Sequence, residues 1–472
     1  MRAAFLCLAA LAQLALSASA SEPITVPLYR RSDDGGIYKA AGKALENGVL
    51  AGKVKIGSPP QEFVFAFDTT TGYSWVRGSR CKTANCRGRC SYYSRKSSDA
   101  VSVGKKFSIE YGDSCVDTHV YMDTFEFAGL TVKDMPFGGA YRMSGFGQGF
   151  DGYLGLGRNV DFNSTKIHSS AANGMSKRDI ALPDSAFVPN AFQQGAGLAS
   201  AQFGMYTTST GSGFDQSGTT NNPGVNNDQN IPNNGTDPTV PPGTNPVVPP
   251  GGDATNPNPT TPGTDDGGVT SGGFGSMKKR TNTEAEEPAG YLVLGGVDKS
   301  IIDGEVNYLR LAADPEAPAK NWDICIRHAS FGNLKLEQGQ YAIASISTST
   351  SYIVMPHKQA DAFHEEFGAE YDIKTKSYNI KCSEIKDLPL LKMTLEDHIV
   401  ELPAKYWTGA IDVDSDKCFT KISRGNSELD WVLGTSVTNA FYTTFDPEAE
   451  TVGLAIKKGQ SKDGLRVYRK SH

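Results

Sequence analysis

The sequence lacks the features of a membrane protein, a metalloenzyme or a nucleic-acid-binding protein. After the first twenty residues, no apolar run reaches the length of a membrane helix. The net charge of -6 and the pI near 5.7 argue against nucleic acid as a partner. The seven histidines are dispersed, with no His-Glu-x-x-His helix and no Cys/His ligand spacing, so we expect no metal and no cofactor.

Residues 1–20 have the pattern of a secretory signal: a basic residue near the start, an apolar run over 3–16 and a short end of small residues. We therefore expect a secreted protein without a membrane anchor. Residues 21–46 form a possible short pro-segment, because they contain the dibasic pair Arg30 and Arg31. Such pairs are processing sites in secreted proteins, although they also occur by chance.

The segment 207–289 differs from the rest of the chain in composition. Gly, Asn, Pro, Thr, Ser and Asp dominate it, and it contains no Lys or Arg before Lys278. Such a segment buries too little apolar surface to offset its ordering entropy, so we predict a disordered insert. Exposed basic residues at its end favour cleavage near Lys279 and Arg280. The expected product is a monomer, in a two-chain form if this cleavage occurs.

Two further features follow from a secreted location. Asn163 and Asn234 each begin an Asn-x-Ser/Thr sequon and are candidate glycosylation sites. The chain has eight cysteines, and seven remain if the expected signal, which contains Cys7, is cleaved. In an oxidising compartment most of the seven should form disulfides.

Strand patterns dominate the chain from about residue 49, and the best helix is predicted over 356–367. Pro356 starts it, and Ala360, Phe363 and Phe367 recur at helical spacing. We place His364, with the two glutamates that follow it, on the solvated face of this helix.

Two ten-residue stretches of the chain match each other. The first, 67–76, reads Phe-Asp-Thr-Thr-Thr-Gly-Tyr-Ser-Trp-Val; the second, 346–355, reads Ile-Ser-Thr-Ser-Thr-Ser-Tyr-Ile-Val-Met. A later motif is also repeated, as Asp-Gly-Tyr-Leu-Gly over 151–155 and Asp-Trp-Val-Leu-Gly over 430–434. Gly155 follows Asp68 by 87 positions, and Gly434 follows Ser347 by the same number. The sequence therefore predicts a duplicated lobe.

These motifs resemble those of the pepsin-like aspartic peptidases. The shared pattern is a hydrophobic-Asp-Thr strand end, a small-residue loop, an apolar-Trp-Val strand and a later Phe-Asp-Gly-hydrophobic-Leu-Gly-Leu. The resemblance implies an all-β, bilobal fold with a peptide-binding cleft between two pseudo-twofold-related lobes. The lobes would span 47–206 and 309–472, with an interlobe strand region over 290–308. The segments that flank the insert would be neighbouring strands.

The resemblance also identifies candidate substrate-binding residues. The strands predicted over 107–112 and 120–127 align with the hairpin that forms the flap of the family, and Tyr111 falls at the flap tyrosine. Trp75 would support this tyrosine, and Thr350 would line the site from the second copy of the motif.

Disulfide pairs are implied in the same way. The pairs that match the family are Cys81 with Cys86 and Cys382 with Cys418. Cys90 and Cys115 are then left in one lobe and could pair with each other. Cys325 is odd, and it is either a buried free thiol or part of an intermolecular bridge.

The chain departs from the family at the reactive centre. Aspartic peptidases use two close carboxylates that share a proton; here Asp68 is present, but Ser347 occupies the second position. The glycine expected after each Asp-Thr pair is replaced by Thr70 and Ser349. Without a second carboxylate to compete for its proton, Asp68 is predicted to titrate near an ordinary aspartate.

These observations favour a catalytically impaired or inactive pseudopeptidase that binds an extended peptide or protein. One alternative is an active aspartic endopeptidase that hydrolyses proteins at acid pH through Asp68. A further alternative is a structural or cell-surface protein that uses only the stability of the fold.

Overall fold

The computed structural model describes residues 24–28, 49–111, 114–146, 149–158, 160, 182–207, 289–312, 321–373 and 377–470. The expected signal, both sequons and the Lys279-Arg280 pair lie outside these residues, as does almost all of the insert. Five residues of the possible pro-segment are described. No helix in the described ranges combines the length and apolar character needed to cross a membrane.

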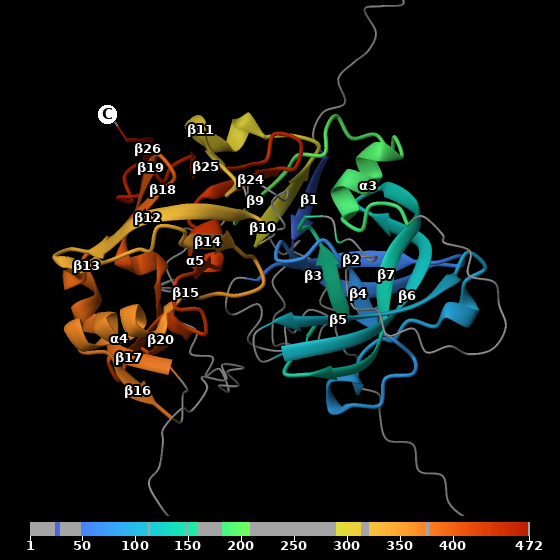
Figure 1. Ribbon diagram of the computed structural model, residues 1–472, viewed down its shortest axis with the longest axis horizontal. Helices are drawn as coiled ribbons and strands as arrows, with labels where there is room; N and C mark the ends of the chain where they lie inside the picture. Colours follow the sequence, from blue (N-terminus) through green and yellow to red (C-terminus); the bar gives the residue numbers. More distant parts are fainter. Residues whose placement is uncertain are drawn as a thin grey trace, which may run out of the picture. The chain divides into compact units, whose positions relative to one another are not determined.

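The first lobe is built on a seven-stranded sheet (Figure 1, blue to teal). In spatial order its strands are β2 (Ala51–Ile56), β3 (Gln61–Asp68), β8 (Gly152–Gly155), β4 (Trp75–Arg77), β7 (Leu130–Ser144), β6 (Ser114–Phe127) and β5 (Val101–Tyr111). Strands β5 and β6 pair antiparallel up to Tyr111 and Ser114, which confirms the predicted hairpin. The long strand β7 beside β6 was not predicted from the sequence.

The second lobe contains a nine-stranded and a four-stranded sheet. The larger sheet has the order β22 (Ile422–Gly425), β15 (Ile353–Pro356), β23 (Trp431–Leu433), β14 (Ile343–Ile346), β12 (Asp323–Phe331), β18 (Leu391–Leu395), β19 (His398–Leu402) and β26 (Arg466–Arg469), with β13 (Leu334–Leu336) paired to β12. The smaller sheet consists of β16 (Glu370–Asp372), β17 (Ser377–Lys381), β21 (Lys417–Thr420) and β20 (Thr408–Asp412).

A six-stranded sheet takes strands from both halves of the chain. Its order is β1 (Ile24–Leu28), β10 (Gly290–Leu294), β9 (Phe203–Thr207), β24 (Tyr442–Asp446), β25 (Thr451–Lys457) and β11 (Ile302–Arg310). Thr207 and Gly290 are paired residues at one end of the β9–β10 hairpin. The two strands that flank the insert are therefore neighbours, as predicted. Strand β1 comes from the possible pro-segment and pairs with β10.

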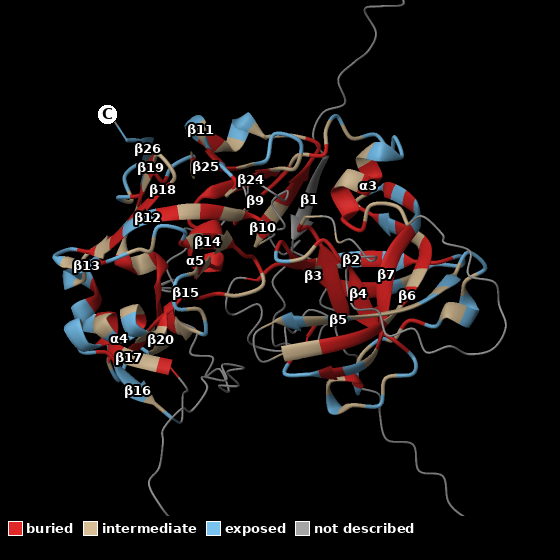
Figure 2. Cartoon of the chain, viewed as in Figure 1, coloured by how far each residue is buried: buried red, intermediate tan, exposed pale blue. Residues whose placement is uncertain are grey.

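Three short α-helices accompany the sheets in the described chain: α3 (Phe187–Gln193), α4 (His357–Glu366) and α5 (Thr435–Thr438). Five 3₁₀ turns are also present: η1 (Ala84–Cys86), η2 (Ser94–Lys96), η3 (Lys299–Ile301), η4 (Cys382–Asp387) and η5 (Ala404–Tyr406). Helix α4 confirms the prediction and packs on β15 and β22, while α3 was not predicted. In Figure 2 strand β3 is buried, whereas α4 keeps an exposed face.

His364 of α4 does not lie on the solvated face. Its side chain is buried, its ring stacks on Tyr378, and Nε2 lies 3.3 Å from Thr420 Oγ1. The helical spacing placed the two glutamates on the exposed face correctly, but the four-stranded sheet covers the histidine beside them. Burial lowers the pKa of His364 to about 3.

This buried histidine should make the fold sensitive to acid. A folded-state pKa of about 3, below the ordinary value of 6.5, means that only the unfolded chain takes up the proton as the pH falls from 6.5 towards 3. We expect the free energy of unfolding to fall by up to about 1.4 kcal/mol per pH unit in this range. A His364→Phe variant keeps the stacked ring and should show a correspondingly shallower slope in urea denaturation. An unchanged slope would contradict this assignment.

The structure contains the two disulfides implied by the resemblance. They join Cys81 to Cys86 and Cys382 to Cys418. The pairing of Cys90 with Cys115 is not formed, and both thiols are free. The amide of Cys90 donates a hydrogen bond to the carboxylate of Asp151, whereas the sulfur of Cys115 lies 3.2 Å from Ser144 Oγ on β7. The two residues are thus held on different elements.

Cys325 is a free thiol as well, in a partly buried position on β12. Burial and the carboxylate of Glu396 raise the pKa of this thiol to about 11. A thiol with such a pKa is a poor nucleophile, in keeping with the free-thiol interpretation.

Candidate active site

The two copies of the sequence motif occupy equivalent places in the two lobes. Strand β3 runs parallel to β8 and ends with Asp68 opposite Gly155; β14 runs parallel to β23 and ends with Ile346 opposite Leu433. A β-carbon on Gly155 would lie 2.6 Å from the nitrogen of Tyr73 in the adjacent loop. The equivalent Gly434 is equally crowded, because its β-carbon would lie 2.4 Å from backbone oxygens of the second loop. Both motifs end in glycine because the loop backbone leaves no space there.

A second pair of contacts confirms the duplication. The carboxylate of Asp151 accepts a hydrogen bond from the amide of Val64 at 2.8 Å. Asp430 accepts one from the amide of Ile343 at 3.4 Å. In each lobe the repeated aspartate therefore fixes the strand that leads into the motif.

The threonines Thr69 and Thr348 link the two loops by reciprocal hydrogen bonds. Each amide donates to the other hydroxyl, and both distances are 3.1 Å. The hydroxyls in turn donate to backbone oxygens of the opposite strand, Thr69 to Ile346 at 3.1 Å and Thr348 to Phe67 at 2.7 Å. Both threonines are buried, so these bonds are shielded from water and hold the loops in a fixed relation.

Three hydroxyls meet beside Asp68. Thr70 Oγ1 lies 2.9 Å from Ser347 Oγ and 2.9 Å from Ser349 Oγ, and the two serine oxygens are 3.0 Å apart. We call this group the hydroxyl triangle. Each hydroxyl carries one proton, and in each of the three pairs either oxygen can be the donor. Thr70 belongs to the first lobe and the serines to the second, so the triangle also bridges the two loops.

Asp68 lies beside this triangle and is completely buried, with 0% of its surface exposed. The amide of Thr70 donates to Oδ1 at 2.8 Å, whereas Oδ2 has no hydrogen-bond partner among the described residues. The hydroxyls of Thr70, Tyr111 and Ser349 are close enough to lower the pKa of this carboxyl, but burial outweighs them and raises it to about 6. The prediction of an ordinary aspartate pKa was therefore wrong, because it considered only the missing charge and not the loss of water.

Tyr111 and Trp75 lie together, as the resemblance implied. Trp75 Nε1 donates to Tyr111 Oη at 3.1 Å. The ring of Tyr111 contacts Phe146 and Tyr153 edge-on, with centroids 5.7 and 5.3 Å away. Burial and the nearby charge of Asp68 raise the pKa of Tyr111 well above its ordinary value, so its hydroxyl stays protonated. Tyr111 therefore lies between the carboxylate of Asp68 and the rings of Phe146 and Tyr153, which we call the aromatic wall.

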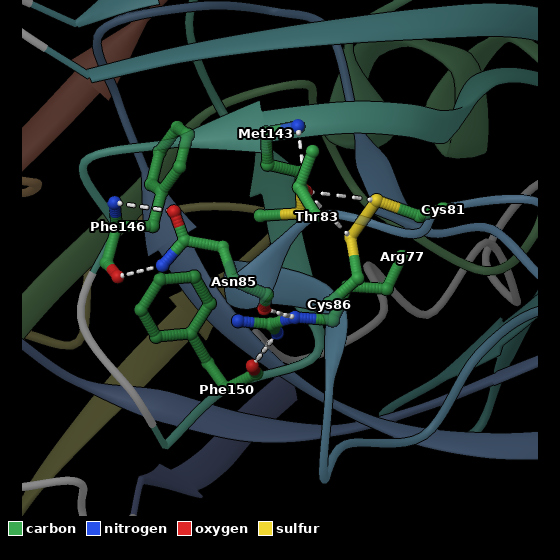
Figure 3. Close-up of a disulfide and its surroundings, with 8 residues drawn as sticks. All are labelled: Arg77, Cys81, Thr83, Asn85, Cys86, Met143, Phe146 and Phe150. Atoms are coloured by element: carbon green, nitrogen blue, oxygen red, sulfur yellow. Dashed lines mark hydrogen bonds between the residues drawn. A yellow bond between two sulfur atoms is a disulfide. The ribbon is translucent and has the colours of Figure 1, made fainter. Parts of the chain in front are cut away.

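The short disulfide loop supports this aromatic wall (Figure 3). Asn85 Nδ2 donates to the carbonyl of Phe146 at 2.6 Å, and the amide of Phe146 is 3.4 Å from Asn85 Oδ1. The buried Arg77 donates to the carbonyls of Asn85 and Phe150. Thr83 Oγ1 lies near both sulfurs of the disulfide and accepts from the amide of Met143.

Sequence reasoning missed Asn85 and Arg77 as supporting residues. The position of Arg77 directly after Trp75 and Val76 was the one sequence feature that could have indicated such a role. It could not be interpreted without knowing that Arg77 is buried.

Thr350 is placed differently from the other two predicted substrate-binding residues. Its hydroxyl accepts from the amide of Tyr352 at 3.3 Å, as that of Thr71 accepts from Tyr73 at 3.1 Å. None of its described hydrogen bonds reaches Tyr111 or Trp75, so its clearest role is to shape its own turn. Within the described ranges, no cluster of three His, Cys, Asp or Glu side chains could hold a metal ion.

Known proteins are similar to this chain in sequence. The chain is 21% identical to pregnancy-associated glycoprotein 1 of Bos taurus, with 86% of this chain and 81% of that protein covered. It is 23% identical to cathepsin D of Gallus gallus, with 86% and 79% covered, and 23% identical to gastricsin of Callithrix jacchus, with 86% and 80% covered. The family model described as eukaryotic aspartyl protease matches residues 50–214 and 279–457. The chain therefore belongs to the eukaryotic aspartyl protease family and has the bilobal, mostly β pepsin-like fold.

Proposed function

We propose that this protein binds an extended peptide or protein segment beneath the β5–β6 hairpin and does not hydrolyse it efficiently. The observation that carries the proposal is the hydroxyl triangle beside a fully buried Asp68. In the alignment of the two motifs, Ser347 of this triangle corresponds to Asp68, so we assign it to the position of the second carboxylate. The retained contacts between Thr69 and Thr348, and between Trp75 and Tyr111, support a site whose framework is intact.

The chemistry of the family needs two carboxylates in different protonation states. One takes a proton from the attacking water while the other donates to the substrate carbonyl. Ser347 does not ionise in the working pH range, so it cannot take the role of either carboxylate. Loss of a general acid-base partner costs on the order of 10² to 10⁴ in rate, and more where the groups act as a unit. Burial of Asp68 also keeps a water molecule from reaching its carboxylate.

Binding does not require the second carboxylate. An extended ligand can form backbone hydrogen bonds with strand edges, and pockets for its side chains add specificity. Below a pH of about 6 the carboxyl of Asp68 is protonated, so a ligand that covers the site does not enclose an unpaired negative charge beneath it. We therefore expect binding to tighten as the pH falls through this value.

The test compares the full-length protein with an Asp68→Ala variant. Acid proteolysis of a denatured protein substrate should stay at background for both, while a statine-type inhibitor, which mimics an extended peptide, should bind the unmodified protein. Asp414→Ala is a matched control, because Asp414 is exposed on the turn between β20 and β21. Proteolysis that depends on Asp68 would establish the active-peptidase alternative. Absence of inhibitor binding would leave the fold with a structural role.

We further propose that the protein is secreted and glycosylated, and that it is a monomer which becomes two-chain on cleavage near Lys279 and Arg280. Hydrogen bonding between β9 and β10 would hold the two chains together. Denaturing electrophoresis of secreted material should show two bands, and a single full-length band would contradict the cleavage.

A further inference from the structure

Positive charge is concentrated in one short segment of this acidic protein. Residues 77–106 contain a single acidic residue, Asp99. The same segment contains nine basic residues: Arg77, Arg80, Lys82, Arg87, Arg89, Arg95, Lys96, Lys105 and Lys106. The whole chain has a net charge of -6, so this segment differs from the rest of the molecule in sign.

Most of these cations have no acidic partner. Arg77 is buried, and Arg89 pairs with Asp151 at 3.1 Å. No carboxylate among the described residues forms a salt bridge with the six that we call the basic belt: Arg80, Lys82, Arg87, Arg95, Lys96 and Lys106. Elsewhere in the described chain, eleven Lys and Arg side chains form such pairs. All six are exposed except Lys106, which is partly buried.

Backbone contacts bring the members of the basic belt together. The amide of Ser79 donates to the carbonyl of Tyr92 at 3.0 Å, so the strand end before Arg80 lies beside the segment that leads to η2. The Cys81–Cys86 disulfide closes the loop that carries Lys82. This loop is held against β7 by the bond between Thr83 and Met143, which Figure 3 shows.

Strand β5 joins the same surface through His119. Lys106 and His119 are paired residues on β5 and β6. The amide of Gly78, two residues before Arg80, donates to the carbonyl of Ala140 at 2.9 Å, and His119 pairs with Gly139 on the same strand. In keeping with this, burial and the charges of Lys106 and Arg80 lower the pKa of His119. The belt therefore continues from the disulfide loop onto the β5–β6 hairpin.

Two tyrosines lie among the cations. Lys96 Nζ is 4.6 Å from the ring centre of Tyr93, and Lys106 Nζ is 5.4 Å from that of Tyr141. The Tyr141 ring in turn packs against His119 at 4.6 Å. The tyrosine rings offer an apolar surface on which a sugar ring can pack. The cations beside them attract the anionic substituents of that sugar.

The basic belt does not coincide with the proposed peptide site. Neighbouring residues of a strand point to opposite faces of the sheet. Phe107 packs on Tyr73 with ring centres 4.7 Å apart, on the side of the aromatic wall. Lys106 therefore lies on the opposite face of the strand from Phe107 and the aromatic wall.

We propose that the basic belt binds a sulfated polysaccharide. Unpaired lysines and arginines on one surface attract a linear polyanion and release its counterions. A membrane surface is a weaker candidate, because Tyr93 and Val101 are the only large apolar side chains exposed in this segment.

The test measures binding of the full-length protein to immobilised heparin at several salt concentrations. We expect binding in 0.15 M salt that weakens linearly on a log-log plot of affinity against salt. The variant that replaces Arg80, Lys82, Arg87 and Lys106 with Gln should bind at least tenfold more weakly. Its salt slope should fall by about one for each cation that no longer meets the polyanion. The matched control replaces four exposed lysines outside the belt with Gln: Lys299, Lys335, Lys358 and Lys462.

The control should retain its affinity for heparin within about twofold. It loses the same net charge as the belt variant, but it keeps every cation of the belt in place. Both variants should keep the melting temperature and the inhibitor binding of the unmodified protein, which separates this proposal from that of the peptide site. Equal losses in the two variants, or no binding to heparin at 0.15 M salt, would overturn it. Binding to phosphatidylserine vesicles without binding to heparin would overturn it in favour of a membrane.

Discussion

Replacement of Asp68 by Asn should stabilise the folded protein at pH 7 by about 3 kcal/mol. Burial raises the pKa of Asp68 from its ordinary value of 3.8 to about 6 in the folded chain. The folded chain thus holds this proton more tightly than the unfolded chain, and the stability from it is lost as the pH rises from 3.8 through 6. A shift of about 2.2 pH units corresponds to about 3 kcal/mol. Asn is uncharged at every pH and avoids this loss.

The measurement is urea denaturation followed by tryptophan fluorescence between pH 3 and pH 8. The Asn variant should be more stable only above about pH 4, and the difference should reach its full value above pH 6. Asp414→Asn makes the same chemical change at an exposed position and should alter stability little at any pH. A destabilised Asp68→Asn protein at pH 7 would mean that the ionised carboxylate has a partner which stabilises it.

Residue patterns and the family resemblance together predicted several elements of the fold. The hairpin of β5 and β6 and helix α4 follow from residue patterns, whereas the β9–β10 pair was implied by the resemblance. Strand β7 and helix α3 were missed. Neither has a clear periodic signal, and β7 is nearly continuously buried from Met135 to Ala140, so alternation does not mark it.

The candidate site was predictable in its residue types but not in its electrostatics. The motif comparison identified Asp68, Ser347, Thr70 and Ser349, and the structure brings all four together. Whether a carboxylate is ionised depends on how much water reaches it, and neighbouring sequence does not report this. The error at His364 has the same origin, since its burial is imposed by strands distant in sequence.

Conversion of Ser347 to Asp should not by itself produce efficient proteolysis. Ser347 shares hydrogen bonds with Thr70 and Ser349, and both hydroxyls would remain to bond a new carboxylate. They would occupy the space and the hydrogen bonds that an attacking water needs. The triple variant Thr70→Gly, Ser347→Asp and Ser349→Gly removes the hydroxyl triangle and supplies the second carboxylate. We expect it to cleave a denatured protein at pH 3 to 4 on the order of 10² to 10⁴ times faster than the unmodified protein.

The controls separate the two halves of this expectation. Adding Asp68→Asn to the triple variant should return the rate to background, because a single carboxylate cannot share a proton. The double variant Thr70→Gly and Ser349→Gly, which keeps Ser347, should also remain at background. Full activity from Ser347→Asp alone would show that Thr70 and Ser349 do not obstruct the site. A folded triple variant that binds the inhibitor and still fails to cleave would contradict the proposal that the hydroxyl triangle and the lack of a carboxylate at position 347 limit proteolysis.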